Sequence, residues 1–191
     1  MIGRVRHPVR WVAGLVLLAL VIVAVVVATR PSEQATQVQS PLVGHDAPAL
    51  AGTTLSGSRF SISEERGHYV YVNFFASWCP PCQEEEQALI DFAFSDRASA
   101  RMVSVVFNDT VSDARTFVSQ WGITWPVVPD SAGSIANRYG VESPPTTFLI
   151  DPHGTVVGTW EGPVTVAQLD EMLTDARRGE LFSGGTGTRD G

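Results

Sequence analysis

Cys79 and Cys82 are the only two cysteines of the 191-residue chain, and two prolines separate them. A Cys-x-x-Cys pair can alternate between dithiol and disulfide, and its first sulfur gains reactivity at a helix N-terminus. Unpaired N–H groups and the helix dipole favour a thiolate there. The spacing therefore indicates a redox site, with Cys79 as the nucleophile and Cys82 as the more buried resolving cysteine.

Three other uses of the pair are disfavoured. A disulfide that closes so short a loop adds little chain-entropy stabilisation. A structural zinc site takes four ligands, and the chain has no second cysteine pair to complete one. Covalent haem attachment requires His directly after the second cysteine, where this chain has Gln83. We therefore expect no metal and no cofactor besides the cysteine pair itself.

A strand and a helix must position the pair. Residues 69–75 are rich in aromatic and β-branched side chains, which is typical of a buried strand, and residues 83–94 have the composition of a helix. Cys79 would lie where the strand gives way to the helix. Because Pro80 and Pro81 lack N–H groups, fewer donors would stabilise the Cys79 thiolate. We expect a lower reduction potential than that of the strong oxidant DsbA.

The surrounding pattern predicts an α/β domain over residues 42–180. Short apolar runs broken by glycines at 49–62 predict a β-hairpin added at the sheet edge. Residues 181–191 are rich in Gly and Thr and are expected to be disordered. Trp121, Trp125 and Trp160 are expected in the core. Further strands are predicted at 101–107, 126–130, 146–150 and 155–160, and further helices at 113–121, 135–139 and 164–178.

Charge and hydropathy indicate where the domain works. The net charge is −7, which argues against nucleic-acid partners. Residues 1–10 carry three arginines, and the uncharged, apolar residues 11–29 are long enough to cross a bilayer as a helix. The positive-inside rule then predicts a cytoplasmic N-terminus and an extracytoplasmic domain, joined by a flexible linker at 30–41. A cleaved signal peptide is the alternative, although residues 26–28 make a poor cleavage site.

Several motifs together resemble the membrane-anchored TlpA/ResA/DsbE (CcmG)-type thiol–disulfide oxidoreductases. They are VNFFASWCPPC at 72–82 with Glu85 behind it, PPTTFLID at 144–151, and Gly44-x-x-Ala47-Pro48. The similarity covers residues 42–178. It implies an α/β thioredoxin fold, with a central mixed β-sheet flanked by helices, an N-terminal β-hairpin extension and an inserted helix. One N-terminal transmembrane helix would precede this domain.

The resemblance also implies roles for single residues. Cys79, Cys82 and Glu85 would form the catalytic set, with Glu85 influencing cysteine acidity. Pro145 matches the cis-proline that faces the cysteine pair, and the backbone of Pro144 would pair with an extended substrate by strand addition. The substrate-binding residues would be Trp78, which forms an exposed lip, together with Pro80, Pro81, Pro144, Pro145 and Thr146.

Departures from the family pattern refine this assignment. Asn73 stands where cytosolic thioredoxins keep a buried Asp as proton acceptor, so proton handling falls to Glu85 or water. Glu84 and Glu86 are interpreted as solvated helix carboxylates. The CcmG-like branch often carries Glu after the cis-proline, and Thr146 at this position favours the TlpA/ResA side.

The function implied by the resemblance is the reduction of protein disulfides outside the cell membrane. Apocytochrome c would be the leading substrate, in cytochrome c maturation, and a membrane electron donor of the DsbD/CcdA type would restore the dithiol. An oxidase that makes disulfides in secreted proteins, a peroxiredoxin-like peroxidase, and a metal-chaperone or substrate-binding module remain alternatives. A peroxidase would carry a Thr in the turn before its cysteine, where this chain has Ala76-Ser77-Trp78.

Overall fold

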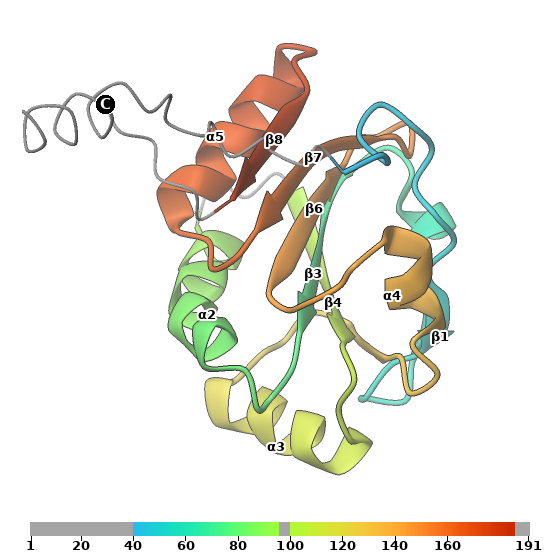
Figure 1. Cartoon of the computed structure of the whole chain (residues 1–191), viewed down its shortest axis with the longest axis vertical. Coiled ribbons are helices and arrows are strands. Elements are labelled where there is room, and N and C mark those ends of the chain that lie inside the picture. The colour runs from blue at the N-terminus through green and yellow to red at the C-terminus, as the bar shows by residue number, and fades with distance from the viewer. Residues whose placement is uncertain (1–39, 96–99, 186–191) are drawn as a thin grey trace, which may run out of the picture. The chain divides into compact units, whose positions relative to one another are not determined.

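The computed structural model describes residues 40–95 and 100–185 (Figure 1). The transmembrane segment expected at 11–29 lies outside the described residues, as do the basic segment 1–10, nearly all of the linker and the tail beyond residue 185. Within the described ranges, no helix combines the length and the apolar character needed to cross a membrane.

A mixed six-stranded sheet forms the centre of the domain. Its strand order is β5-β4-β3-β6-β7-β8; β3, β4 and β5 run parallel, whereas β6 is antiparallel to both β3 and β7. The central strand β3 carries large side chains on both faces, and it is buried on both, as a central strand requires. The strands are β3 (Tyr69–Phe75), β4 (Ala100–Val106), β5 (Val127–Pro129), β6 (Thr146–Ile150), β7 (Val156–Glu161) and β8 (Phe182–Gly185).

Helices cover both faces of this sheet (Figure 1). Alternate residues of β3 point to opposite faces, so Tyr71 meets Phe92 of α2 (Pro80–Ala93) with ring centroids 5.2 Å apart. On the other face Phe74 lies 5.3 Å from Tyr139 of α4 (Ser134–Tyr139). The remaining helices are η1 (Ile62–Glu65), a 3₁₀ helix, α3 (Val111–Trp121), and α5 (Val166–Arg177), which lies beside α2.

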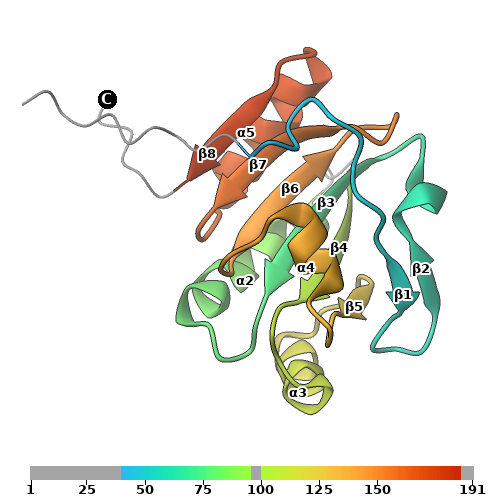
Figure 2. The same cartoon turned by 45° about the vertical axis from the view of Figure 1, so that its right-hand side comes forward.

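The predicted elements are confirmed with small shifts of their ends, except at two places. The first exception is the N-terminal hairpin: β1 (Ala51–Thr53) and β2 (Arg59–Ser61) form a separate two-stranded sheet instead of extending the main one (Figure 2). Among the described residues, a single backbone hydrogen bond joins this hairpin to β5: the Leu55 N–H donates to Val127 O at 2.8 Å. Prolines 126 and 129 at the ends of β5 lack the N–H groups that a continued ladder would need.

The second exception is the C-terminal segment, which was expected to be disordered from residue 181. Instead β8 pairs in parallel with β7, and the folded domain extends to residue 185. Phe182 is buried, and its ring stacks on Trp160 with centroids 6.1 Å apart. A Cβ added at Gly184 would lie 2.5 Å from the Trp160 ring. Gly184, one of the glycines that suggested disorder, therefore permits close packing against the tryptophan.

Candidate active site

The two cysteines form a disulfide at the start of α2, with their Cα atoms 5.3 Å apart. Cys79 is the N-cap of the helix, and its Sγ accepts a hydrogen bond from the Cys82 backbone N–H at 3.2 Å. Pro80 and Pro81 occupy the first helical turn and offer no N–H. Cys79 is 3% exposed and Cys82 is fully buried. The helix thus gives Cys79 the more accessible position but few backbone donors.

The loop before Cys79 is fixed by the loop that follows β4. The Ser77 backbone N–H donates to Asp109 Oδ2 at 2.7 Å, and the Trp78 Nε1–H donates to the Asn108 carbonyl at 3.1 Å. Trp78 is 54% exposed, which agrees with the expected exposed lip beside the cysteine pair.

The Pro144–Pro145 peptide bond is cis and lies immediately before β6. Thr146 of β6 pairs with Phe74 of β3, and β3 ends at Phe75, just before the cysteine loop. The cis bond and the cysteine loop therefore lie at the same edge of the sheet. Pro145 and Thr146 are buried while Pro144 is half-buried, so Pro144 is the accessible member of this group.

Glu85 is buried in the interior, one helical turn beyond Cys82. Its Oε1 accepts a hydrogen bond from Asn73 Nδ2 at 2.8 Å, and its Oε2 accepts one from the Val164 backbone N–H at 2.9 Å. Burial raises the pKa of Glu85 to about 7, against the opposing effect of these two bonds. Asn73 itself cannot take up a proton, but its hydrogen bond fixes the position of Glu85, whose carboxyl group can.

Glu86 is also buried, which corrects the expectation that it is solvated. Its Oε1 has no hydrogen-bond partner within the described part of the chain. Burial, and secondarily the charge of Glu85, raises the pKa of Glu86 to about 8. Three consecutive glutamates resemble a solvated run, but Glu86 lies four residues after Cys82 and three before Leu89, a spacing that indicates the buried face. Glu84 is exposed, as expected.

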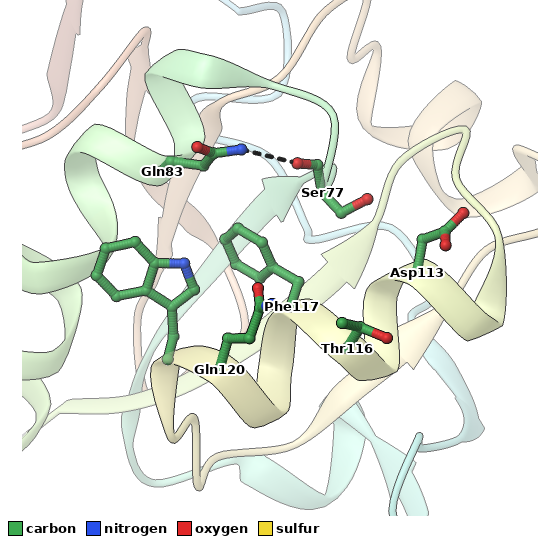
Figure 3. A pocket seen from close by; sticks show the side chains of 7 residues that line it. Ser77, Gln83, Asp113, Thr116, Phe117 and Gln120 are labelled. Carbon is green, nitrogen blue, oxygen red and sulfur yellow. Dashed lines mark hydrogen bonds between the residues drawn. The ribbon is translucent and has the colours of Figure 1, made fainter.

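A hollow of about 530 Å³ lies between the start of α2 and one face of α3 (Figure 3). The Gln83 side-chain amide donates to the Ser77 carbonyl at 3.0 Å on one wall of this hollow. Trp121, expected in the core, is half-buried and contributes to the other wall. The sequence predicts helix α3 but not the hollow, which depends on how α3 lies relative to α2. We call this space the α3 hollow. Its lining residues are Ser77, Gln83, Asp113, Thr116, Phe117, Gln120 and Trp121.

The mixed sheet, the cysteine pair at a helix N-terminus and the adjacent cis-proline define a thioredoxin-like thiol–disulfide oxidoreductase. The family model described as AhpC/TSA matches residues 43–159, and the chain belongs to this family.

Relatives and solved structures agree with this assignment. The chain is 31% identical to the thiol-disulfide oxidoreductase ResA of Bacillus thuringiensis subsp. konkukian, over 69% of this chain and 76% of the relative. A thiol:disulfide interchange protein of the thioredoxin family from Chlorobium tepidum aligns with a TM-score of 0.60 and 28% identity, covering 69% of this chain and 94% of that one. StoA from Bacillus subtilis aligns with a TM-score of 0.58 and 29% identity, covering 70% of this chain and 99% of that one.

Proposed function

We propose that this oxidoreductase works as a reductase of protein disulfides on the outer side of a cell membrane. The observation that favours reduction over oxidation is that few hydrogen-bond donors are available to stabilise a Cys79 thiolate. Among the described residues, the Cys82 N–H is the single hydrogen-bond donor to Cys79 Sγ, because prolines fill the two positions between the cysteines. Stabilising the reduced thiolate is what makes a dithiol pair an oxidant, so weak support favours reducing behaviour.

The buried carboxyl groups of α2 act in the same direction. Glu85 and Glu86 follow Cys82 by about one helical turn, and both are shielded from water. A negative charge on either one disfavours a second negative charge on a nearby sulfur. With pKa values of about 7 and about 8, Glu85 and Glu86 are only partly ionised at neutral pH, so we infer that this effect on the thiolate strengthens as pH rises through these values.

The reaction follows from the order of the two cysteines. The Cys79 thiolate attacks one sulfur of the substrate disulfide, which forms a mixed disulfide and releases the other substrate sulfur as a thiolate that takes up a proton. Cys82 then loses its proton and attacks Cys79 Sγ, which releases the second substrate sulfur. The substrate gains two electrons and two protons, and the Cys79–Cys82 disulfide forms. A donor dithiol must then reduce it again.

We assign proton handling at Cys82 to Glu85. Its carboxyl group lies in the interior on the same helix, its pKa is raised to about 7, and Asn73 and the Val164 N–H fix its orientation. A group with a pKa near the working pH can accept and return a proton efficiently. Substrate would approach Trp78, Pro80, Pro81 and Thr146 and pair with the backbone at Pro144, next to cis-Pro145.

The proposed location and partners rest on the N-terminal sequence and on the resemblance. Residues 11–29 would anchor the domain outside the cytoplasmic membrane. A membrane donor of the DsbD/CcdA type would supply electrons, and apocytochrome c would be a substrate. The relation to the thiol-disulfide oxidoreductase ResA of B. thuringiensis supports the disulfide chemistry on which these proposed partners depend.

The reduction potential tests the direction of electron flow. We expect a value nearer the −270 mV or so of thioredoxin than the roughly −120 mV of DsbA. Equilibration with a defined thiol–disulfide redox buffer, read by alkylation of the free cysteines, measures it. A value near that of DsbA would overturn the reductase assignment in favour of an oxidase.

Trapping identifies the substrates. Cys82→Ser leaves the mixed disulfide unresolved, so partners should accumulate as complexes with the full-length protein in its native membrane. Cys79→Ser is the matched control and should trap none of them. Peroxide consumption by the wild-type protein that is lost in Cys79→Ser would instead indicate a peroxidase.

A further inference from the structure

The α3 hollow has a lining that the disulfide chemistry does not use. Five of its residues recur along α3 at positions 113, 116, 117, 120 and 121, a spacing that places them on one helix face. Ser77 and Gln83 form the opposite wall (Figure 3). Ser77 lies two residues before Cys79, and Gln83 directly follows Cys82. A ligand in the hollow would therefore contact the segment that carries the disulfide.

The floor of the hollow is aromatic and its rim is polar. Phe117 is buried and Trp121 half-buried, whereas Thr116, Gln120 and Asp113 are exposed. In Figure 3, Phe117 points from α3 toward the wall that holds Ser77 and Gln83. An aromatic floor with polar groups around it suits a side chain that has an apolar stem and a polar end.

The charge of the hollow is negative. Asp113 is the single charged residue in the lining, and its Oδ2 accepts a hydrogen bond from Thr110 Oγ1 at 2.7 Å. No hydrogen bond from the described residues reaches its Oδ1. Asp109 adds a second carboxylate beside Ser77, at 2.7 Å from the Ser77 nitrogen. Arg115 does not neutralise these charges in the hollow, because its guanidinium donates to the Leu55 carbonyl.

We propose that the α3 hollow is a substrate subsite that binds a Lys or Arg side chain of the polypeptide being reduced. The proposal rests on the function proposed above. The cationic end pairs with the carboxylate of Asp113, and the aliphatic stem lies against the aromatic floor, where Phe117 follows Asp113 by one helical turn. The amides of Gln83 and Gln120 add hydrogen-bonding groups at the rim.

The position of the hollow determines which substrate residue enters it. An extended chain advances about 3.3 Å per residue. Because Ser77 and Gln83 flank the cysteine pair, a substrate whose cysteine faces Cys79 would bring a side chain roughly three positions away over the α3 hollow. The subsite would select among disulfides by their flanking sequence, separately from backbone pairing at Pro144.

Peptide kinetics with the reduced, full-length protein test this subsite. The substrates are short peptides in which one cysteine forms a mixed disulfide with a chromophoric thiol, and which carry Lys, Glu or the neutral isostere norleucine three positions from that cysteine. Release of the chromophore gives the second-order rate constant. We expect the Lys peptide to react about fivefold faster than the Glu peptide, an advantage that shrinks with added salt.

Two variants and one control test whether the Lys-over-Glu preference arises in the α3 hollow. Asp113→Asn should reduce the Lys-over-Glu ratio to near one, and Gln120→Glu should at least double it by adding a carboxylate to the rim. Glu84→Gln removes an exposed charge from the outer side of α2 and should leave the ratio unchanged. Because Gln120 is exposed, its variant keeps the test valid even if Asp113→Asn fails to fold.

The outcomes separate this inference from the proposed function. Equal rates for the Lys and Glu peptides, or a Lys preference that persists in Asp113→Asn, would overturn the subsite while leaving the reductase intact. Failure of the wild-type protein to reduce hydroxyethyl disulfide as well as every peptide would instead overturn the proposed function.

Discussion

Two adjacent glutamates on α2 differ in their partners and therefore in their expected effects. Glu85 has hydrogen bonds to both carboxylate oxygens, whereas Glu86 Oε1 has no partner within the described residues. Both carboxyls have a raised pKa, chiefly because of burial. We therefore expect Glu85 to influence the chemistry of Cys82 and Glu86 to influence the pH dependence of folding.

Glu85→Gln tests the proton-handling role. The substitution keeps the size of the side chain, and Asn73 can turn its unpaired Oδ1 toward the new amide. We expect resolution of the mixed disulfide by Cys82 to slow by about 10- to 100-fold at neutral pH. The dependence of this step on a group with a pKa near 7 should disappear. Stopped-flow measurement across pH checks this; an unchanged pH profile would contradict the role, and Glu84→Gln serves as the control.

Glu86 should make the folded protein less stable as pH rises. Its folded pKa of about 8 exceeds the ordinary 4.5, so the folded state holds a proton that the unfolded chain has lost between these values. The stability contribution is therefore present below pH 4.5 and is lost as pH rises to 8.

Replacing Glu86 by Gln should remove this pH dependence. We expect Glu86→Gln to raise the free energy of unfolding at pH 8 by on the order of 2 kcal/mol, with little effect at pH 4.5. Urea unfolding at several pH values measures it. Glu84 is exposed, so Glu84→Gln should leave the free energy of unfolding unchanged at both pH values. If the free energy of unfolding changed equally with pH in wild type and Glu86→Gln, Glu86 would not be buried and protonated as described.

At the scale of elements, β8 is the strand that the glycine-rich composition of its segment did not predict. Its one large side chain, Phe182, packs on Trp160, and Gly184 allows the strand to lie against that ring. The strand completes the sheet edge next to β7. We therefore expect the segment to contribute to stability and not to behave as a tail.

Phe182→Ala should destabilise the domain by about 3 kcal/mol, since it removes a buried aromatic ring. The neighbouring Leu181 is 57% exposed, so Leu181→Ala should change stability by less than about 0.5 kcal/mol. Chemical denaturation of both variants measures the contrast. Similar small effects at the two positions would show that β8 does not pack as described.

At the scale of the whole molecule, the redox state and the stability of the fold are linked. A pair that reduces other disulfides must form its own disulfide readily, so the folded domain should favour the oxidised state. We expect the oxidised protein to unfold at a higher urea concentration than the reduced one. DsbA, whose reduced form is stabilised, is the opposite case. A reduced form more stable than the oxidised form would contradict the proposed direction of electron flow.

Local sequence determined the central part of the site. The strand at 69–75, the cysteine pair and the following helix are contiguous, so the N-cap position of Cys79 follows from residue types alone. The resemblance added the cis-proline at position 145, which the structure has. The prediction of Glu84 as exposed also holds, because a helix surface follows from its own periodicity.

Tertiary structure decided what depends on distances between elements. The spacing of Glu86 from Cys82 and Leu89 places it on their helix face, but how completely that face is covered depends on what packs over α2. The separation of the β1–β2 hairpin depends on the prolines of a distant strand. The α3 hollow exists because α3 stands away from the start of α2, a spacing that neither helix encodes by itself. Residue types and their order thus determined the redox chemistry, whereas packing between elements determined the groups that surround it.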